Sequence, residues 1–481
     1  MTSLGVGWRR HASSPASWRD AIERDLPTAR TTRRSFLKGS AAVAAGALVF
    51  PAPSICLAAP RAAGKLNAAV IGAGGMGGYA YGEARGENLV AICDVDKRKI
   101  GGCLKQTPNV PVFKDFREML DKLHKQIDVV LVSTPDPVHF PAAMASMQLG
   151  KHVFVQKPLT HNIWQARTLR KAAAHHKVQT VMGNQGHTFD GIRRIREWYE
   201  SGLAGEVKEI NSWTNRPRAP WFVKPASIPP KPADVPPEVD WDLWLGPAAE
   251  RPFSHEYMPE RWRGWWDFGC ASLGDIGCHT FDSPFWAMGL GMPAKIEVEM
   301  KQPAIKEYMP WGALTTYHFP ARGGKPPVTL KWFEDAYPPP KPERWEGNFN
   351  PGEGGMAMIG SKETIYHDGM RPDSPKLLPD SHMNEMKKKL NELRRYPSVR
   401  GGPIRELFAA IKNEGPKPSS DFEYAAQLTE VVLLGALAQR TGTAIEWDAE
   451  NMKVKGRPEL DVLIKEPVRK GWAFGEELWK K

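Results

Sequence analysis

Three residues of this 481-residue chain have the types and spacing that proton transfer and charge stabilisation require. Lys157 follows a short apolar run, Val153–Val155, and Pro158 restricts the backbone after it. An ammonium group held in this way can stabilise negative charge that grows on a reacting oxygen. Asp275 and His279 are spaced i, i+4, so on a helix their side chains lie on one face and can touch. A carboxylate in that position fixes the tautomer of the imidazole and raises its basicity, as a general base requires.

A site of this kind needs a bound cofactor, and a glycine-rich loop near the start of the chain has the sequence to bind one. The apolar run Leu66–Ile71 reads as a buried strand, leads into GAGGMG at Gly72–Gly77, and is followed by a helical pattern through Glu83. This is the context in which the motif binds a dinucleotide. The first glycine permits the turn, the second lets the backbone approach a pyrophosphate, and the third lets the helix pack on the strand. A glycine turn that binds no nucleotide is the alternative.

Asp94 ends the next apolar strand, Leu89–Cys93, about twenty residues after the loop. A carboxylate there accepts hydrogen bonds from the adenosine ribose and repels a 2′-phosphate. We therefore expect NAD as the cofactor, with NADP less favoured, although the nearby Lys97 and Arg98 could soften that preference.

Short apolar runs then alternate with helical patterns as far as the strand Val178–Met182, which predicts a parallel, doubly wound sheet. Ligands bind beyond the carboxyl ends of such strands. Polar residues collect at those ends: Asp94, Thr134, His139, Lys157, Asn184 and His187. We expect His139 on the nicotinamide side, and Asn184 and His187 on the substrate side.

The second half of the chain is rich in aromatic residues. Eleven of the 18 tryptophans lie between residues 213 and 345, among them Trp265, which we consider a candidate substrate contact. Flat aromatic faces pack well on sugar rings, and filling a core or a subunit interface is the alternative. Residues 215–260 hold eleven prolines and read as an irregular surface excursion. Strand-like runs at 295–300, 312–319, 327–333 and 356–367, with a late helix at 424–440, predict an α+β domain with a mostly antiparallel open sheet.

Taken together, these motifs resemble the Gfo/Idh/MocA oxidoreductases over roughly residues 65–450. The resemblance rests on GAGGMG, the Asp-ended second strand, the STPDPVH segment at 133–139, the Lys-Pro segment, and a Gly-x-x-x-Asp-x-Gly-x-His-like stretch at 270–279. It implies cofactor contacts from Gly72, Gly74, Gly75, Met76, Gly77, Asp94, Thr134, Pro135, His139, Gln156 and Lys157. The chain departs from the family at Gln156, where Glu is usual, so Lys157 lacks a neighbouring carboxylate in the sequence.

The N-terminal residues 1–60 read as an export leader. Arg33 and Arg34, followed by Ser-Phe-Leu-Lys and the apolar stretch Gly39–Phe50, resemble a twin-arginine signal, which passes folded proteins to the export machinery. We expect a periplasmic or otherwise exported protein, with an uncleaved signal as a possible membrane anchor. The cleavage site stays open, as does whether Met1 is the true start. No span is expected in the mature form, because the apolar stretch is shorter than the ~20 residues that cross a bilayer.

Composition narrows the classes further. The net charge is +11, of which residues 1–58 contribute +5, and no long Lys/Arg run remains that would bind nucleic acid. The five Cys form no CxxC pair, and no HxH or HExxH spacing indicates a metal site. The length favours several domains. We expect a dinucleotide-binding domain at 65–187, a substrate and oligomerisation domain at 188–450 and a tail at 451–481, assembled as a homodimer or homotetramer.

Three functions stay open. The leading hypothesis is an NAD(P)-dependent oxidoreductase that acts on a secondary hydroxyl or ketone of a sugar or sugar derivative and keeps its cofactor. The second is an NAD-dependent glycoside-cleaving enzyme that works by transient oxidation, elimination, hydration and re-reduction, as some relatives do. The third is a non-catalytic nucleotide-binding protein.

Overall fold

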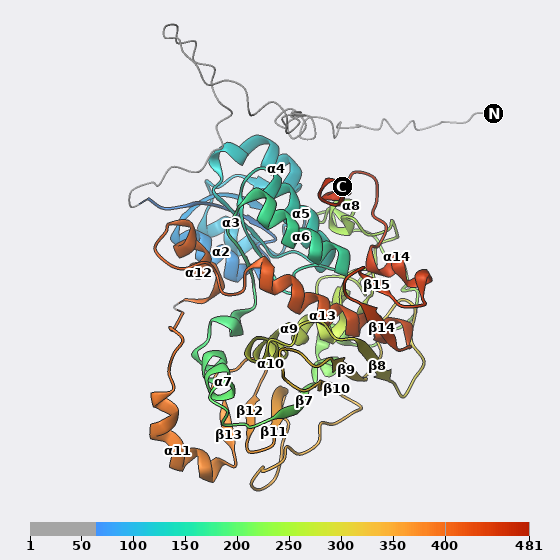
Figure 1. The fold of residues 1–481 in the computed structure, drawn as a ribbon. Coiled ribbons are helices and arrows are strands. Elements are labelled where there is room, and N and C mark those ends of the chain that lie inside the picture. The colour runs from blue at the N-terminus through green and yellow to red at the C-terminus, as the bar shows by residue number, and fades with distance from the viewer. Residues whose placement is uncertain (1–63, 400, 481) are drawn as a thin grey trace, which may run out of the picture.

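The computed structural model describes residues 64–399 and 401–480, so the predicted leader at 1–60 lies outside the described part. The described chain forms two sheets, one parallel and one mostly antiparallel, with helices around the first and between the two (Figure 1). This is the predicted fold class: a doubly wound Rossmann-type domain followed by an α+β domain. No helix in this part of the chain is long and apolar enough to cross a membrane.

The first sheet has six parallel strands in the order β3-β2-β1-β4-β5-β6. This is the strand order of dinucleotide-binding folds, in which the direction of winding reverses between β1 and β4. Its central strands are almost wholly apolar because helices cover both faces. The strands are β1 (Asn67–Ile71), β2 (Asn88–Cys93), β3 (Val112–Phe113), β4 (Val129–Val132), β5 (His152–Val155) and β6 (Thr180–Met182). The connecting helices are α2 (Gly77–Gly86), α3 (Gly101–Gln106), α4 (Phe116–Leu123), α5 (Asp136–Gln148) and α6 (Ile163–His176).

The second sheet has nine strands among the described residues, in the order β13-β12-β11-β7-β10-β9-β8-β14-β15. All neighbours are antiparallel except β7 and β10. The apolar run predicted as one strand at 356–367 is two strands, because a turn at Ser361–Glu363 folds it into a hairpin. The strands are β7 (Val207–Thr214), β8 (Lys295–Glu299), β9 (Leu314–Phe319), β10 (Val328–Glu334), β11 (Gly354–Gly360), β12 (Thr364–Asp368), β13 (Lys376–Leu378), β14 (Ile445–Asp448) and β15 (Lys453–Val454).

Helix α13 (Phe422–Thr441) joins the two domains (Figure 1). It is buried along nearly its whole length and packs on α6 of the first domain and on β8 of the second. The chain after it returns to the first domain, where Trp472 packs on Phe116 and Trp479 on Trp164. The remaining helices are α7 (Asp190–Glu200), α8 (Trp241–Leu245), α9 (Cys278–Thr280), α10 (Asp282–Met288), α11 (Asp380–Glu392), α12 (Gly402–Ile411) and α14 (Asp461–Ile464).

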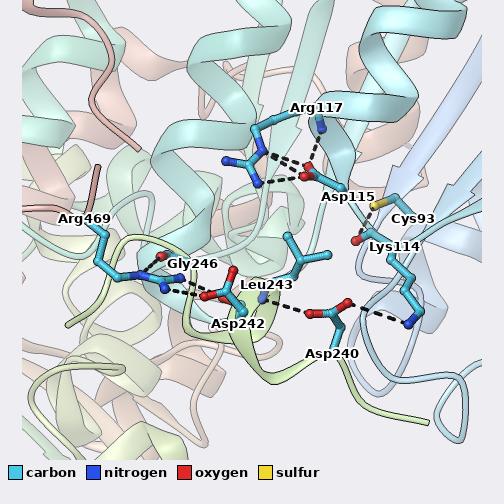
Figure 2. Close-up of polar contacts among 9 residues, drawn as sticks. All are labelled: Cys93, Lys114, Asp115, Arg117, Asp240, Asp242, Leu243, Gly246 and Arg469. Atoms are coloured by element: carbon cyan, nitrogen blue, oxygen red, sulfur yellow. Dashed lines mark hydrogen bonds and ion pairs between the residues drawn. The ribbon is translucent and has the colours of Figure 1, made fainter. Parts of the chain in front are cut away.

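The proline-rich excursion at 215–260 packs on the first domain beside β2. The backbone N–H of Asp240 donates to the carbonyl of Val95, 2.9 Å away, just beyond that strand. Figure 2 shows Asp240 between Lys114 of the first domain, 3.7 Å away, and the backbone N–H of Leu243, which it caps. Arg469 from the C-terminal segment holds the same turn through the carbonyl of Gly246 at 2.8 Å. The excursion and the tail thus cover the edge of the dinucleotide domain.

Candidate active site

One cavity of about 410 Å³ runs beside the carboxyl ends of the first sheet, and segments of the second domain line its other side. Eleven of the residues singled out in the sequence line it: Gly72, Gly74, Gly75, Met76, Asp94, Thr134, Pro135, Gln156, Lys157, Asp275 and His279. Five do not: Gly77, His139, Asn184, His187 and Trp265. The excursion and the tail contribute Leu243, Trp244 and Trp472 to the wall.

The glycine loop is shaped by contacts that leave no room for side chains. Gly72 has φ +79°, and a Cβ there would lie 2.7 Å from the carbonyl oxygen of Ser133. A Cβ on Gly74 would lie 2.6 Å from the Cβ of Lys99. A Cβ on Gly77 would lie 1.9 Å from the carbonyl oxygen of Gly72, so this glycine lets α2 begin against the loop although it does not face the cavity.

Asp94 holds this loop as well as lining the cavity. Its Oδ2 accepts hydrogen bonds from the backbone N–H of Ala73 at 2.9 Å and of Gly74 at 3.2 Å, and its Oδ1 accepts one from Asp96 at 2.9 Å. Burial raises the pKa of Asp94, and the three N–H donors oppose that rise. This contact with the loop could not be predicted from the sequence, because it depends on how two neighbouring strands end in space. Arg98 pairs with Asp96 at 2.7 Å through its Nη2, and its Nε donates to the same carboxylate at 2.8 Å.

The residues around the loop fit a dinucleotide. Thr134 Oγ1 and Gln156 Nε2 line the cavity, are buried, and have no hydrogen-bond partner within the described chain. Buried polar atoms are normally paired, so these two have capacity for a bound molecule. With the glycine cradle, they are the groups that would hold the phosphates and the nicotinamide end.

Lys157 is held by Asp275. Its Nζ donates to Asp275 Oδ1 at 2.7 Å and to the Asp275 carbonyl oxygen at 2.5 Å. Burial alone would raise the pKa of Asp275, but Lys157 and Arg263 hold it well below its ordinary value. Gln156 provides no carboxylate next to Lys157 in the sequence. In the structure Asp275 of the second domain provides one instead.

The prediction that Asp275 and His279 contact each other is wrong. The Nδ1 of His279 lies 2.9 Å from Asn184 Oδ1, while Asp275 binds Lys157. The cause is local: residues Leu273–Gly277 form a π-helical turn, so the i, i+4 spacing does not stack the two side chains as an α-helix would. Burial lowers the pKa of His279 well below its ordinary value, and the nearby Lys157, Arg371 and Arg216 add to the effect.

Three residues that we predicted to contact the cofactor or the substrate instead pack against other parts of the protein and do not line the cavity. His139, expected beside the nicotinamide, is buried, with Nδ1 2.9 Å from the Pro158 carbonyl oxygen and Nε2 2.8 Å from that of Thr134. It therefore ties the loop after β4 to the segment that carries Lys157. His187, expected on the substrate side, is fully buried against Asp282 at 2.8 Å. Trp265 is in the aromatic core and donates to the carbonyl of Glu256. Asn184 does not line the cavity but holds His279.

The sequence reasoning missed three arginines that line the cavity near Lys157 and Asp275: Arg216, Arg263 and Arg371. They come from three separate segments: a short 3₁₀ turn after β7, another before the π-helical turn, and a loop after β12. The concentration of tryptophans between residues 213 and 345 indicated this region in part, because Trp221 and Trp262 line the cavity beside these arginines. No group of three His, Cys, Asp or Glu side chains within residues 64–399 and 401–480 is placed to hold a metal ion.

The fold and the cavity are those of a two-domain, dinucleotide-binding protein. Comparison with protein-family models agrees: residues 66–184 match the oxidoreductase family, NAD-binding Rossmann fold, and residues 210–319 match the oxidoreductase family, C-terminal alpha/beta domain. Both are domain models of the Gfo/Idh/MocA oxidoreductase family. Residues 30–50, outside the described part, match the signal sequence of the twin-arginine translocation pathway.

Curated relatives share a part of this chain. An inositol 2-dehydrogenase of Rubrobacter xylanophilus is 30% identical over 154 residues, which are 31% of this chain and 44% of that protein. An alpha-N-acetylgalactosaminidase of Shewanella oneidensis is 30% identical over 242 residues, 40% of this chain and 51% of that one. The matched part of the chain thus spans about half of the length of these two relatives.

Solved structures share the fold over most of the chain. The WlbA dehydrogenase of Bordetella pertussis, in complex with NADH and UDP-GlcNAcA, is 14% identical with a TM-score of 0.54, covering 80% of this chain and 99% of that one. A levoglucosan dehydrogenase in complex with NADH is 16% identical with a TM-score of 0.51, covering 79% and 98%. At these identities the similarity shows the fold alone.

Proposed function

We propose that this protein is an NAD-dependent oxidoreductase that acts on a secondary hydroxyl or ketone of a sugar or sugar derivative. The observation that carries the proposal is that Lys157 and His279 face the same cavity as the glycine loop. Bound NAD would supply the hydride acceptor and donor of the reaction.

Lys157 is the cationic donor to the reacting oxygen. Asp275 keeps its ammonium in place, and as charge develops on the substrate oxygen the ammonium stabilises it. His279 is the base. Its Nδ1–H donates to Asn184 Oδ1, which leaves the lone pair on Nε2 to accept the hydroxyl proton. The lowered pKa of His279 keeps the ring neutral before the substrate proton is transferred.

The Asp94 carboxylate supports a preference for NAD over NADP, because it would repel a 2′-phosphate. The cover formed by the excursion and the tail supports slow release of the cofactor. We propose that the protein is exported to the periplasm or beyond with NAD already bound and regenerates it in place in each catalytic cycle. We further propose a homodimer or homotetramer formed through the open face of the second sheet, which light scattering would test.

A second candidate function is glycoside cleavage without net redox change. The similarity to an alpha-N-acetylgalactosaminidase and to glycosyl hydrolase family 109 proteins of Shewanella species favours it. Lys157 and His279 would act in its first step as they do in the dehydrogenase.

The test incubates the exported, purified protein with a panel of glycosides and 3-keto-glycosides, with Lys157→Met as the matched control. Mass spectrometry of the products and the redox state of the released nucleotide separate the two functions. An oxidised or reduced sugar formed in proportion to turnover supports the dehydrogenase, whereas a free aglycone and sugar with no net redox change support cleavage. No Lys157-dependent change in any substrate would contradict both.

A further inference from the structure

The substrate end of the cavity carries more positive charge than the protein neutralises. Lys157, Arg216 and Arg263 surround one carboxylate, Asp275, and Arg371 lines the same cavity. Only the ammonium is hydrogen-bonded to that carboxylate, while the Nε atoms of Arg216 and Arg263 stay 3.8 Å from it. Among the described residues, Asp275 is the one carboxylate that forms an ion pair with any of these four cations.

Other acidic groups nearby do not correct this balance. Asp136 also lines the cavity and is buried, but when its carboxylate is counted, four cations still face two carboxylates. Glu260 and Asp373 are exposed to solvent, where screening weakens their effect.

The arginines are held in position with donors free. Arg216 lies over the ring of Trp221 at 5.0 Å, and Arg263 lies over Trp262 at 4.5 Å. The Nε atoms of Arg216 and Arg371 are buried and have no acceptor among the described residues. A buried donor without an acceptor is costly, and a guanidinium offers the fork geometry that binds an oxyanion.

The pyrophosphate of the cofactor does not explain these arginines. It belongs at the glycine loop and the start of α2, where the backbone provides the donors. The arginines instead approach Asp275, the partner of Lys157, where the reacting oxygen is proposed to bind.

We propose that the substrate is an anionic sugar whose carboxylate, phosphate or sulfate group binds to Arg216, Arg263 and Arg371. This inference rests on the proposed function, since it assumes that a sugar occupies the Lys157 end of the cavity. The three oxyanions share the recognising chemistry, and the experiment separates them.

Isothermal calorimetry on the NAD-loaded protein provides the test. The probes are methyl glucoside and methyl galactoside, the corresponding uronic acids, 6-phosphates and 6-sulfates, and inorganic phosphate as a control for anion binding alone. At least one anionic sugar should bind more tightly than its neutral counterpart, and high salt should reduce the difference.

Arg216→Met and Arg371→Met should each weaken anionic sugar binding about 10- to 100-fold, the range for a charge-assisted hydrogen bond, and leave neutral sugar binding nearly unchanged. Arg218→Met is the matched control: it removes the same charge two residues away, from a side chain that is 70% exposed and paired with Asp335. It should not change binding. Thermal melting and the NAD content should stay at the parental level in all three variants.

Equal binding of neutral and anionic sugars, or failure of every anionic sugar to bind, would overturn the inference. So would binding of inorganic phosphate as tightly as the best sugar. Tight, arginine-dependent binding of an anionic sugar with neither redox change nor cleavage would instead leave the inference standing and contradict the proposed function.

Discussion

The two ends of the cavity are built in different ways. At the cofactor end, Gly72 and Gly74 bring bare backbone to the surface, and acidic and basic side chains lie there together: Asp94, Asp96, Asp115, Lys99 and Lys114. At the substrate end, side chains from four separate segments meet, and most of them are cations. The first end is therefore sensitive to added atoms, and the second to lost charge.

This difference indicates a division of labour. Backbone recognition suits a cofactor that stays the same, whereas side chains on irregular segments can change without disturbing either sheet. Lys157 lies at the boundary, since β5 of the first domain positions it and Asp275 of the second domain binds it.

The largest effect is expected at that boundary. Lys157→Met should lower turnover about 10²–10³-fold through loss of one electrostatic donor, and His279→Ala about 10²–10⁴-fold through loss of the base. Both variants should stay folded and retain NAD, because neither residue belongs to the glycine loop. Steady-state kinetics on the best substrate measures this, and near-parental turnover of either variant would remove that residue from the mechanism.

At the cofactor end, adding one methyl group should be costly. Gly77→Ala would place a Cβ 1.9 Å from the Gly72 carbonyl oxygen, so we expect a loss of about 1–3 kcal/mol in unfolding free energy and weaker NAD retention. Gly78→Ala is the matched control, because a Cβ there meets nothing within 4 Å. It should keep or slightly raise stability. Scanning calorimetry measures both, and equal melting temperatures would show that the loop tolerates a side chain.

The pH dependence tests the cationic end. His279 acts as a base only when neutral, and burial together with Lys157, Arg371 and Arg216 lowers its pKa, while Asp275 opposes the shift. The acid limb of kcat/KM should therefore lie below the pH at which an ordinary histidine titrates. Arg371→Met removes a neighbouring positive charge, so this limb should move to higher pH.

A bound anion sharpens that prediction. An anionic substrate would offset the arginines, so the acid limb of kcat, which reports the complex, should lie at higher pH than that of kcat/KM, which reports the free enzyme. If the acid limbs of kcat and kcat/KM coincide with an anionic substrate, the substrate does not compensate the charge of the arginines, and this prediction is wrong.

The smallest effect concerns cofactor choice. Asp94→Asn keeps an oxygen that can accept from Ala73 and Gly74 but removes the charge, so it should narrow the preference for NAD over NADP by roughly tenfold. Asp94→Ala should also narrow the preference for NAD. It should in addition weaken the binding of both NAD and NADP, because the N–H groups of Ala73 and Gly74 lose the oxygen that accepts their hydrogen bonds. Titration of the nucleotide-free parent and of both variants with NAD and with NADP measures these affinities. Equal affinity of the parent for NAD and NADP would contradict the role of Asp94.

The sequence was most informative where function depends on local geometry. GAGGMG after an apolar strand was enough to predict the loop, and the alternation of strands and helices was enough to predict the first sheet. It was least informative where contacts join distant segments. Arg216, Arg263 and Arg371 lie in short turns and loops far apart in the sequence, and no regular spacing connects them.

The histidines show why residue type alone misleads. His139 and His187 follow strand ends, as functional residues do, yet both rings bind buried partners. The Asp275–His279 spacing predicted a contact that holds only in an α-helix, and the π-helical turn redirects Asp275 to Lys157. These outcomes depend on tertiary packing, which one sequence does not reveal.

The most direct test of the central claim is the nucleotide content of the exported protein. The protein is purified from the exported fraction, desalted and denatured, and the released nucleotide is identified and compared with the protein concentration. We predict near-stoichiometric NAD(H), and turnover by the undenatured sample with no NAD added. A nucleotide-free protein that is active only with millimolar NAD would contradict a folded, cofactor-loaded enzyme that regenerates its cofactor in place.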